Sequence, residues 1–155
     1  MSIKSKQVRR TGMWIAALTM GLAACGDSTG PSLEVIEDVV FHESVGVDLG
    51  EMIEATSGLY YQDLVEGDGE VLVSGANSVV EYLVRFRTGE FVGSDESFAF
   101  TVGDPGLWDG FNLGVVGMRV GGERKIVLPP NLVNDSRFPG RILIFDIELL
   151  EIVQP

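Results

Sequence analysis

The sequence predicts an α+β fold in which an antiparallel β-sheet is wrapped on one short α-helix. Two long segments, residues 79–86 and 142–153, place apolar side chains at every second position, as strands do. Twenty glycines among 155 residues suit the many tight turns of a β-rich chain. The only convincing helix is short, at residues 111–117, where Leu113 and Val116 share a face.

Three further strands are expected, at residues 59–65, 97–102 and 123–128. Aromatic and β-branched residues are frequent in them, and each ends at a glycine- or proline-containing turn. Residues 131–141 are expected to form a loop. Gly110, Gly114 and Gly117 weaken the helix, so packing against the sheet must hold it.

The first 32 residues are typical of an export signal followed by a tether. Residues 1–10 are basic, residues 13–24 are mostly apolar, and Ala23 and Ala24 precede the only cysteine, Cys25. A bilayer span takes about 20 apolar residues, so this run is too short to cross one. The pattern predicts a lipoprotein signal peptide at 1–24, a lipid on Cys25, and a flexible polar tether at 25–32. The alternative is an ordinary signal that leaves Cys25 as a free thiol.

Such a signal sequence predicts a protein of the bacterial cell envelope, held to a membrane by lipid and facing the periplasm or the exterior. Residues 33–56 follow as an N-terminal arm that mixes acids with apolar residues and has no clear period, so we expect weak structure there. The arm could pack on the domain, form a dimer or act as a spacer. His42 lies in this segment, and we expect it to be solvated.

Charge and residue counts exclude several classes of function. The formal charge is −12, and it becomes −16 without residues 1–24, which hold four cations and no acid. Such a domain repels phosphate backbones, so no nucleic-acid partner is expected. One cysteine and one histidine exclude an internal disulfide, a cysteine-based zinc site and a histidine-rich metal centre. We find no Cys–His pair, serine elbow or phosphate loop, and we expect neither metal nor cofactor.

From Gly58 to Val153 the chain resembles an FKBP-type peptidyl-prolyl cis-trans isomerase, in its bacterial lipoprotein form. Seven blocks match family patterns in the right order, and the stretch from Gly103 to Met118 is ungapped. The blocks are residues 80–82 (VEY), 89–91 (GEF), 98–103 (FAFTVG), 107–111 (LWDGF), 114–121 (GVVGMRVG), 124–130 (RKIVLPP) and 145–150 (FDIELL).

The resemblance implies that residues 57–155 form an FKBP-like domain, a curved sheet of five or six antiparallel strands around the helix. It implies a hydrophobic cleft whose residues carry catalysis, with Phe111 as the floor in place of the family's tryptophan. The Trp108 backbone N–H would hold the carbonyl of a bound proline peptide. The cleft residues carried over by position are Tyr82, Phe91, Phe98, Leu107, Trp108, Phe111 and Phe145.

The function implied is isomerisation of proline-containing segments to assist the folding of exported proteins. The alternative is a non-catalytic binding module or chaperone that keeps the same cleft. Two departures bear on the choice, because the resemblance places a polar Asp at Val92 and a Tyr hydroxyl at Asn134. Losing two such hydrogen bonds costs about 1–3 kcal/mol, or roughly 5- to 150-fold in rate, so we expect reduced activity and altered or absent binding of macrolide drugs.

Overall fold

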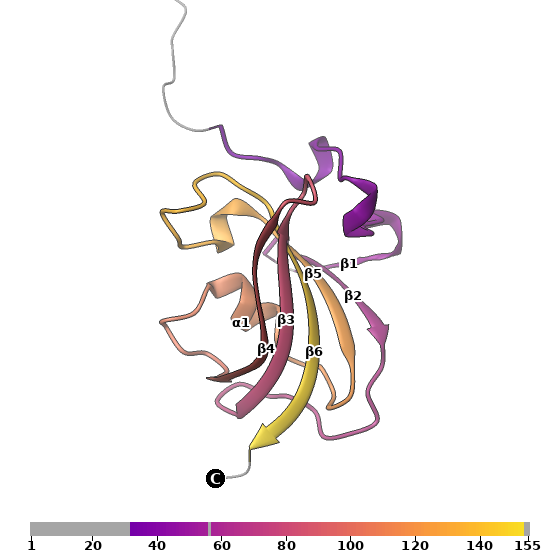
Figure 1. Cartoon of the computed structure of the whole chain (residues 1–155), viewed down its shortest axis with the longest axis vertical. Coiled ribbons are helices and arrows are strands. Elements are labelled where there is room, and N and C mark those ends of the chain that lie inside the picture. The colour runs from indigo at the N-terminus through magenta and orange to yellow at the C-terminus, as the bar shows by residue number, and fades with distance from the viewer. Residues whose placement is uncertain (1–31, 56, 154–155) are drawn as a thin grey trace, which may run out of the picture.

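Six antiparallel strands form one sheet, in the order β1-β2-β5-β6-β3-β4, in the computed structural model, which describes residues 32–55 and 57–153 (Figure 1). The strands are β1 (Ile53–Glu54), β2 (Tyr60–Val65), β3 (Asn77–Phe86), β4 (Phe91–Thr101), β5 (Glu123–Leu128) and β6 (Leu143–Val153). The helices are α1 (Asp109–Val115) and the 3-10 turns η1 (Ile36–Asp38), η2 (Glu43–Val45), η3 (Leu49–Glu51) and η4 (Pro130–Leu132).

The predicted fold class is confirmed, with shifted element boundaries. The helix begins two residues earlier than expected, at Asp109, and ends at Val115. Strand β4 begins at Phe91 rather than at residue 97, because it pairs with β3 along almost its whole length. Strand β6 lies between β5 and β3 and supplies the centre of the sheet.

Helix α1 lies against one face of the sheet at a distance that only glycine permits. A Cβ atom added at Gly114 would lie 2.5 Å from Cδ1 of Ile126, and one at Gly110 would lie 2.7 Å from Cδ2 of Leu128. The glycines that weaken the isolated helix therefore let it settle on β5. The main core lies between α1 and the sheet, and Leu143, Phe145, Ile147 and Leu149 of β6 all face it.

The N-terminal arm is ordered and packs on the opposite face of the sheet, so the expectation of weak structure is wrong. Ile36, Val45 and Met52 are buried there, and β1 pairs with β2. They form a second core against the sheet residues Tyr60, Val127 and Ile144 and against Ile142, which lies just before β6. Of the three possibilities that the sequence left open, the structure shows packing on the domain.

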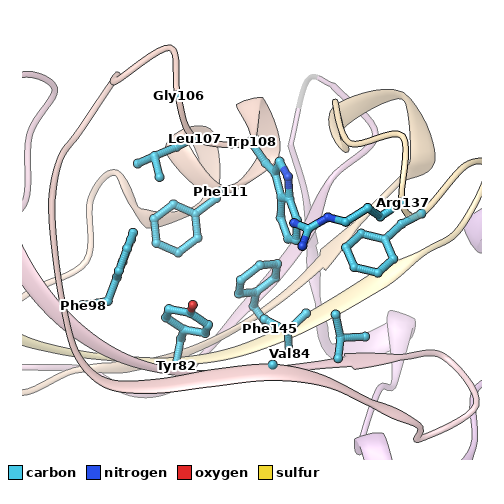
Figure 2. Close-up of a pocket in the computed structure, with 12 residues that line it drawn as sticks. Tyr82, Val84, Phe98, Gly106, Leu107, Trp108, Phe111, Arg137 and Phe145 are labelled. Atoms are coloured by element: carbon cyan, nitrogen blue, oxygen red, sulfur yellow. The ribbon is translucent and has the colours of Figure 1, made fainter.

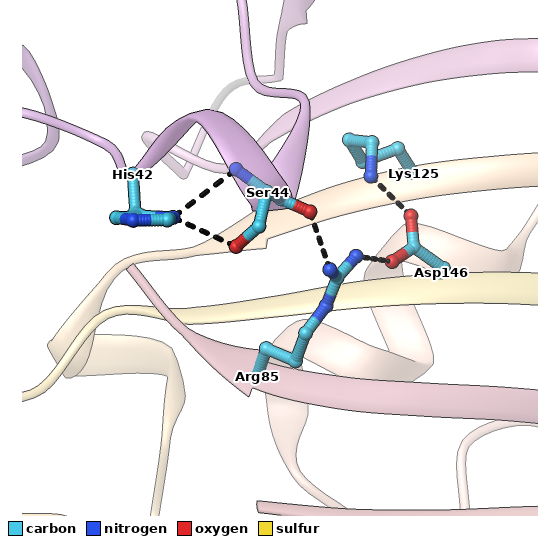
Figure 3. A network of polar contacts seen from close by, with 5 residues as sticks. All are labelled: His42, Ser44, Arg85, Lys125 and Asp146. Carbon is cyan, nitrogen blue, oxygen red and sulfur yellow. Dashed lines mark hydrogen bonds and ion pairs between the residues drawn. The ribbon is translucent and has the colours of Figure 1, made fainter. Parts of the chain in front are cut away.

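Polar contacts fix the arm to the sheet (Figure 3). Arg85 of β3 donates to the backbone carbonyl of Ser44 and pairs with Asp146, which also pairs with Lys125. His42 is exposed as expected, and its Nδ1 lies 2.8 Å from the Ser44 hydroxyl at the start of η2.

A second anchor lies at the first residues of the arm. The carboxylate of Glu34 lies 2.8 Å from Nε of Arg87 and accepts the backbone N–H of Ile142 at 2.7 Å. The backbone N–H of Glu34 donates to the Gly140 carbonyl at 2.9 Å. The arm thus joins the β3–β4 turn to the loop that precedes β6.

The predicted signal peptide, Cys25 and almost all of the tether lie outside the described residues. Within the described ranges, no helix is long and apolar enough to cross a membrane.

Candidate functional site

A cavity of about 320 Å³ opens between α1, strands β3 and β4, and the loop at 133–141. This volume lies at the lower end of the range of small-ligand sites. The cavity is mostly apolar, and Figure 2 shows its aromatic rings converging from several elements. Its lining residues are Tyr82, Val84, Val92, Gly93, Phe98, Gly106, Leu107, Trp108, Phe111, Arg137, Phe138 and Phe145.

Six of the seven predicted cleft residues meet at this cavity, on four separate elements. Tyr82 comes from β3, Phe98 from β4 and Phe145 from β6, while the other three lie at the start of α1. Phe111 is only 4 % exposed, and its ring centre lies 5.6 Å from that of Phe145. Tyr82 meets Phe98 edge to face at 5.5 Å. These contacts fix the rings, so the cavity is formed before any ligand arrives.

The loop before α1 presents Leu107 and Trp108 to the cavity. Gly103 has a φ of 95°, which turns the chain out of β4. Asn112 then ties this loop to the helix, because its side chain accepts the Gly103 N–H at 2.8 Å and donates to the Asp104 carbonyl at 3.0 Å. Trp108 caps the helix in an extended conformation, and its backbone N–H donates to no acceptor in the described part of the chain.

The prediction that Phe91 lines the cleft is wrong. Its side chain is 61 % exposed and lies outside the cavity. The register between β3 and β4 shifts here, since Gly93 pairs with Val84 and Phe91 pairs with Arg85, which leaves Val92 as an extra residue. This bulge places Val92 and Gly93 on the cavity. Val92 thus takes the place in the cavity wall that was expected for Phe91. Gly93, which has no side chain, then takes the place where the resemblance expects the polar Asp.

The loop at 133–141 supplies a wall that sequence reasoning missed. Phe138 meets Trp108 edge to face at 5.9 Å and Phe86 at 5.7 Å. Its only signal in the sequence is an aromatic residue within a polar loop. Asn134, expected in place of a family hydroxyl, is exposed and does not line the cavity. Val84, Gly106 and Arg137 were also missed.

Two ionisable groups at the cavity have shifted pKa values. Burial raises the pKa of the Tyr82 phenol, and the negative charge of Asp95 on β4 raises it further. Tyr82 is therefore a neutral O–H group at physiological pH. Hydrogen bonds from the Arg137 side chain and backbone lower the pKa of Asp135 to about 2. The loop thus carries an ionised Asp–Arg pair at neutral pH.

This arrangement can bind a small apolar ring and fix a polar group beside it. The aromatic floor and walls exclude water, while the Trp108 N–H and the Tyr82 hydroxyl are available as donors. Among the described residues, no group of three or more His, Cys, Asp or Glu side chains is placed to hold a metal ion.

The amino-acid sequence is similar to those of several known proteins. A chloroplastic peptidyl-prolyl cis-trans isomerase of Arabidopsis thaliana, FKBP16-4, is 34 % identical over 114 residues, covering 63 % of this chain and 50 % of that protein. FK506-binding protein 4 of Dictyostelium discoideum is 33 % identical over 111 residues, covering 66 % and 30 %. The chain thus spans half or less of the length of these curated relatives.

Solved structures agree with the fold. The crystal structure of AtFKBP13 superposes with a TM-score of 0.62 at 25 % identity, covering 66 % of this chain and 99 % of that one. The crystal structure of FkpA from Escherichia coli gives 0.60 at 27 %, covering 66 % and 51 %. Residues 69–150 match the family model described as FKBP-type peptidyl-prolyl cis-trans isomerase, and these residues hold every lining position of the cavity. The chain belongs to the FKBP-type peptidyl-prolyl cis-trans isomerase family.

Proposed function

We propose that this chain is a peptidyl-prolyl cis-trans isomerase that binds proline-containing segments in the cavity above Phe111. The observation that carries the proposal is the buried Phe111 ring at the floor of a preformed aromatic cavity. Prolyl isomerisation breaks no bond, and its obstacle is an activation energy of about 20 kcal/mol for rotation about the amide. No nucleophile or metal is needed for this reaction.

The cavity favours the twisted amide through its low polarity. A planar amide has a polarised carbonyl that water stabilises, and rotation removes the resonance that polarises it. Moving the amide into an apolar site therefore costs the ground state more than the transition state. In the proposed pose the proline ring lies on Phe111, and the Trp108 N–H binds a neighbouring peptide carbonyl. The Tyr82 hydroxyl, which is protonated at neutral pH, is a second donor.

The assay is isomerisation of a capped proline tetrapeptide by the soluble chain, residues 26–155, followed by NMR exchange. Phe111→Ala should abolish the acceleration, because it removes the floor. Leu113→Ala is the matched control, since Leu113 lies on the same helix but is 53 % exposed and away from the cavity. Equal rates for wild type and Phe111→Ala would refute the proposed site.

We also propose that the rate is reduced by the missing polar group at Gly93. A Cβ atom built at Gly93 meets nothing within 4 Å, so a side chain can begin there without displacing a neighbour. Gly93→Asp should raise the rate about 5- to 150-fold if a cavity hydrogen bond is lacking. Val92→Asp is the comparison, and it should lower the rate because it replaces an apolar wall. No gain from Gly93→Asp would show that the apolar cavity suffices.

A non-catalytic binding module or chaperone is the second candidate. It is favoured by the small number of side chains in the cavity lining that could form hydrogen bonds, which are Tyr82, Trp108 and Arg137. This candidate predicts that folded wild-type protein binds proline peptides but does not accelerate their isomerisation. Phe111→Ala should lose the binding.

The proposed site of action is the bacterial cell envelope, where the enzyme would assist the folding of exported proteins. The apolar run before Cys25 and the polar tether after it support a lipid anchor. The test is expression of the full chain with a labelled fatty acid. Label and membrane association should both be lost in Cys25→Ser. Label that persists in Cys25→Ser at the wild-type level would refute the anchor.

A further inference from the structure

Arg137 is the only charged side chain among the residues that line the cavity. We infer that Arg137 determines substrate preference, selecting proline segments that carry a carboxylate on a residue next to the proline. The inference rests on the proposed function, because it concerns the ligand of that same site. It assigns a substrate class to a cavity whose remaining lining has no charge.

The guanidinium of Arg137 is held in place rather than free to swing. Its Nε lies 3.1 Å and 3.0 Å from the two carboxylate oxygens of Asp135, and its Nη2 lies 2.6 Å from Oδ2. The backbone N–H of Arg137 also donates to Oδ1 of Asp135 at 2.9 Å. Two-point pairing of this kind fixes the plane of a guanidinium.

Donors remain for a ligand after this pairing. A guanidinium has five N–H groups, and here Nη1 donates to no acceptor in residues 32–55 and 57–153. The Arg137 head lies 5.2 Å from the centre of the Phe138 ring, which packs in turn on Trp108. Figure 2 shows the head reaching back from the loop to lie beside Trp108. A peptide held by the Trp108 N–H therefore passes close to the free donors.

A charge of the opposite sign lies beside Tyr82, on Asp95, which is exposed and outside the cavity lining. Asp95 pairs with Tyr82 in the β3–β4 register, and its charge contributes to the raised pKa of that phenol. A carboxylate near Tyr82 and Phe98 is repelled, whereas one near Trp108 and Arg137 meets hydrogen-bond donors. The two ends therefore give a bound peptide a preferred direction.

The preference is set by contact rather than by the long-range field. Asp135 offsets the Arg137 charge at a distance, and the acidic domain repels every anionic peptide alike. At 0.15 M salt this field is screened beyond about 8 Å, whereas a hydrogen-bonded contact remains. Exposed ion pairs shift equilibria modestly, and Arg137 is 73 % exposed, so we expect a preference of about two- to fivefold in kcat/KM.

The test compares acetylated and amidated proline tetrapeptides at 0.15 M salt by NMR exchange, which needs no coupling protease. Glu and Gln are placed in turn just before and just after the proline. A further pair of peptides ends one residue after the proline, one in a free carboxylate and the other in an amide. This pair tests a C-terminal carboxylate separately from a side-chain carboxylate. The measured quantity is the ratio of kcat/KM for the carboxylate peptide to that for its neutral partner.

Wild type should show a ratio of about two to five at one position or at the terminus. Arg137→Gln should bring that ratio close to one, and Arg137→Glu should invert it. Arg119→Gln is the control and should keep the wild-type ratio, because Arg119 is exposed and does not line the cavity. Since each ratio compares two peptides on one variant, a change in overall activity does not affect it.

A wild-type ratio of one at every position, or a ratio that survives Arg137→Gln, overturns the inference. Failure of the proposed function has a different signature, namely that wild type accelerates none of the peptides, neutral ones included. The same peptides are then titrated against Trp108 fluorescence. For wild type and for Arg137→Gln, the Kd of each carboxylate peptide is compared with that of its neutral partner. This ratio decides the inference by the same criteria.

Discussion

Replacing Ile36 with alanine tests whether the N-terminal arm is an integral part of the folded domain. Ile36 lies in η1, is 3 % exposed, and packs in the second core beneath the sheet. Truncation of a buried isoleucine to alanine costs about 2–5 kcal/mol, and the cost falls where the surroundings can collapse. A short 3-10 turn at the surface of the sheet can move inward, so we expect about 2–4 kcal/mol.

The assay is thermal and urea unfolding of the soluble chain, with Val35→Ala as the matched control. Val35 adjoins Ile36 but is 48 % exposed. A domain of this size loses roughly 3–6 °C of Tm per kcal/mol, so Ile36→Ala should lower Tm by about 6–24 °C. Val35→Ala should change stability by less than about 0.5 kcal/mol.

Small and equal shifts for the two variants would refute this reasoning, because they would mean that the arm leaves the sheet in solution. The prediction has a second readout in activity. The second core and the cavity lie on opposite faces of the sheet, so Ile36→Ala should isomerise peptides at the wild-type rate well below its Tm. A large loss of rate in folded protein would contradict that separation.

Three further perturbations follow from single contacts. Glu34→Gln should cost about 1–3 kcal/mol in urea unfolding, because the amide nitrogen must face either Arg87 or the Ile142 N–H, both of which are donors. A hydrogen bond to Glu37, with burial and nearby acids, raises the pKa of Tyr60 to about 12. The neutral phenol is thus favoured in the fold, and the stability it adds is complete below about pH 10 and lost as the pH rises through about 12, a step that Tyr60→Phe should remove. Gly114→Ala should lower Tm despite the better helix propensity of alanine, because its Cβ would lie 2.5 Å from Cδ1 of Ile126 and overpacking costs about 1–3 kcal/mol.

Each of these has an outcome that would contradict it. Glu43→Gln, on an exposed carboxylate, is the control for Glu34→Gln, and equal effects would mean that the Glu34 contacts contribute nothing. A high-pH step unchanged in Tyr60→Phe would belong to another group. An unchanged or raised Tm in Gly114→Ala would show that α1 can move away from β5 at little cost.

Much of the fold could be predicted because the sheet repeats a simple pattern. In β6, Leu143, Phe145, Ile147 and Leu149 are all buried on the face that packs against α1, as the alternation of a strand predicts. The arm has no such period. Its buried residues Ile36, Val45 and Met52 are separated by irregular 3-10 turns, so their burial depends on a sheet face that local sequence does not reveal.

The cavity shows the same division. The structure brings the expected residues of β3, β6 and α1 to the cavity, whereas Phe91, at the start of β4, lies outside it because of the bulge at Val92. A bulge depends on how two strands pair, and an alignment of short motifs does not detect a shift of one residue. Arg137 and Phe138 were missed because a loop side chain has no periodic pattern to direct it. Here the edge-to-face contact with Trp108 positions Phe138, and the pairing with Asp135 positions Arg137.

The place where the arm begins, taken with the proposed lipid anchor, sets how far the cavity would lie from a membrane. Glu34 is bonded to Gly140, so the described chain starts beside the loop that carries Arg137 and Phe138. Six residues lie between Cys25 and Ser32, and a fully extended chain across this interval reaches about 25 Å at most. With the proposed lipid on Cys25, the mouth of the cavity would be kept within a few nanometres of the lipid headgroups. Clients would then be limited to segments that pass close to the bilayer, such as polypeptides just emerging from it.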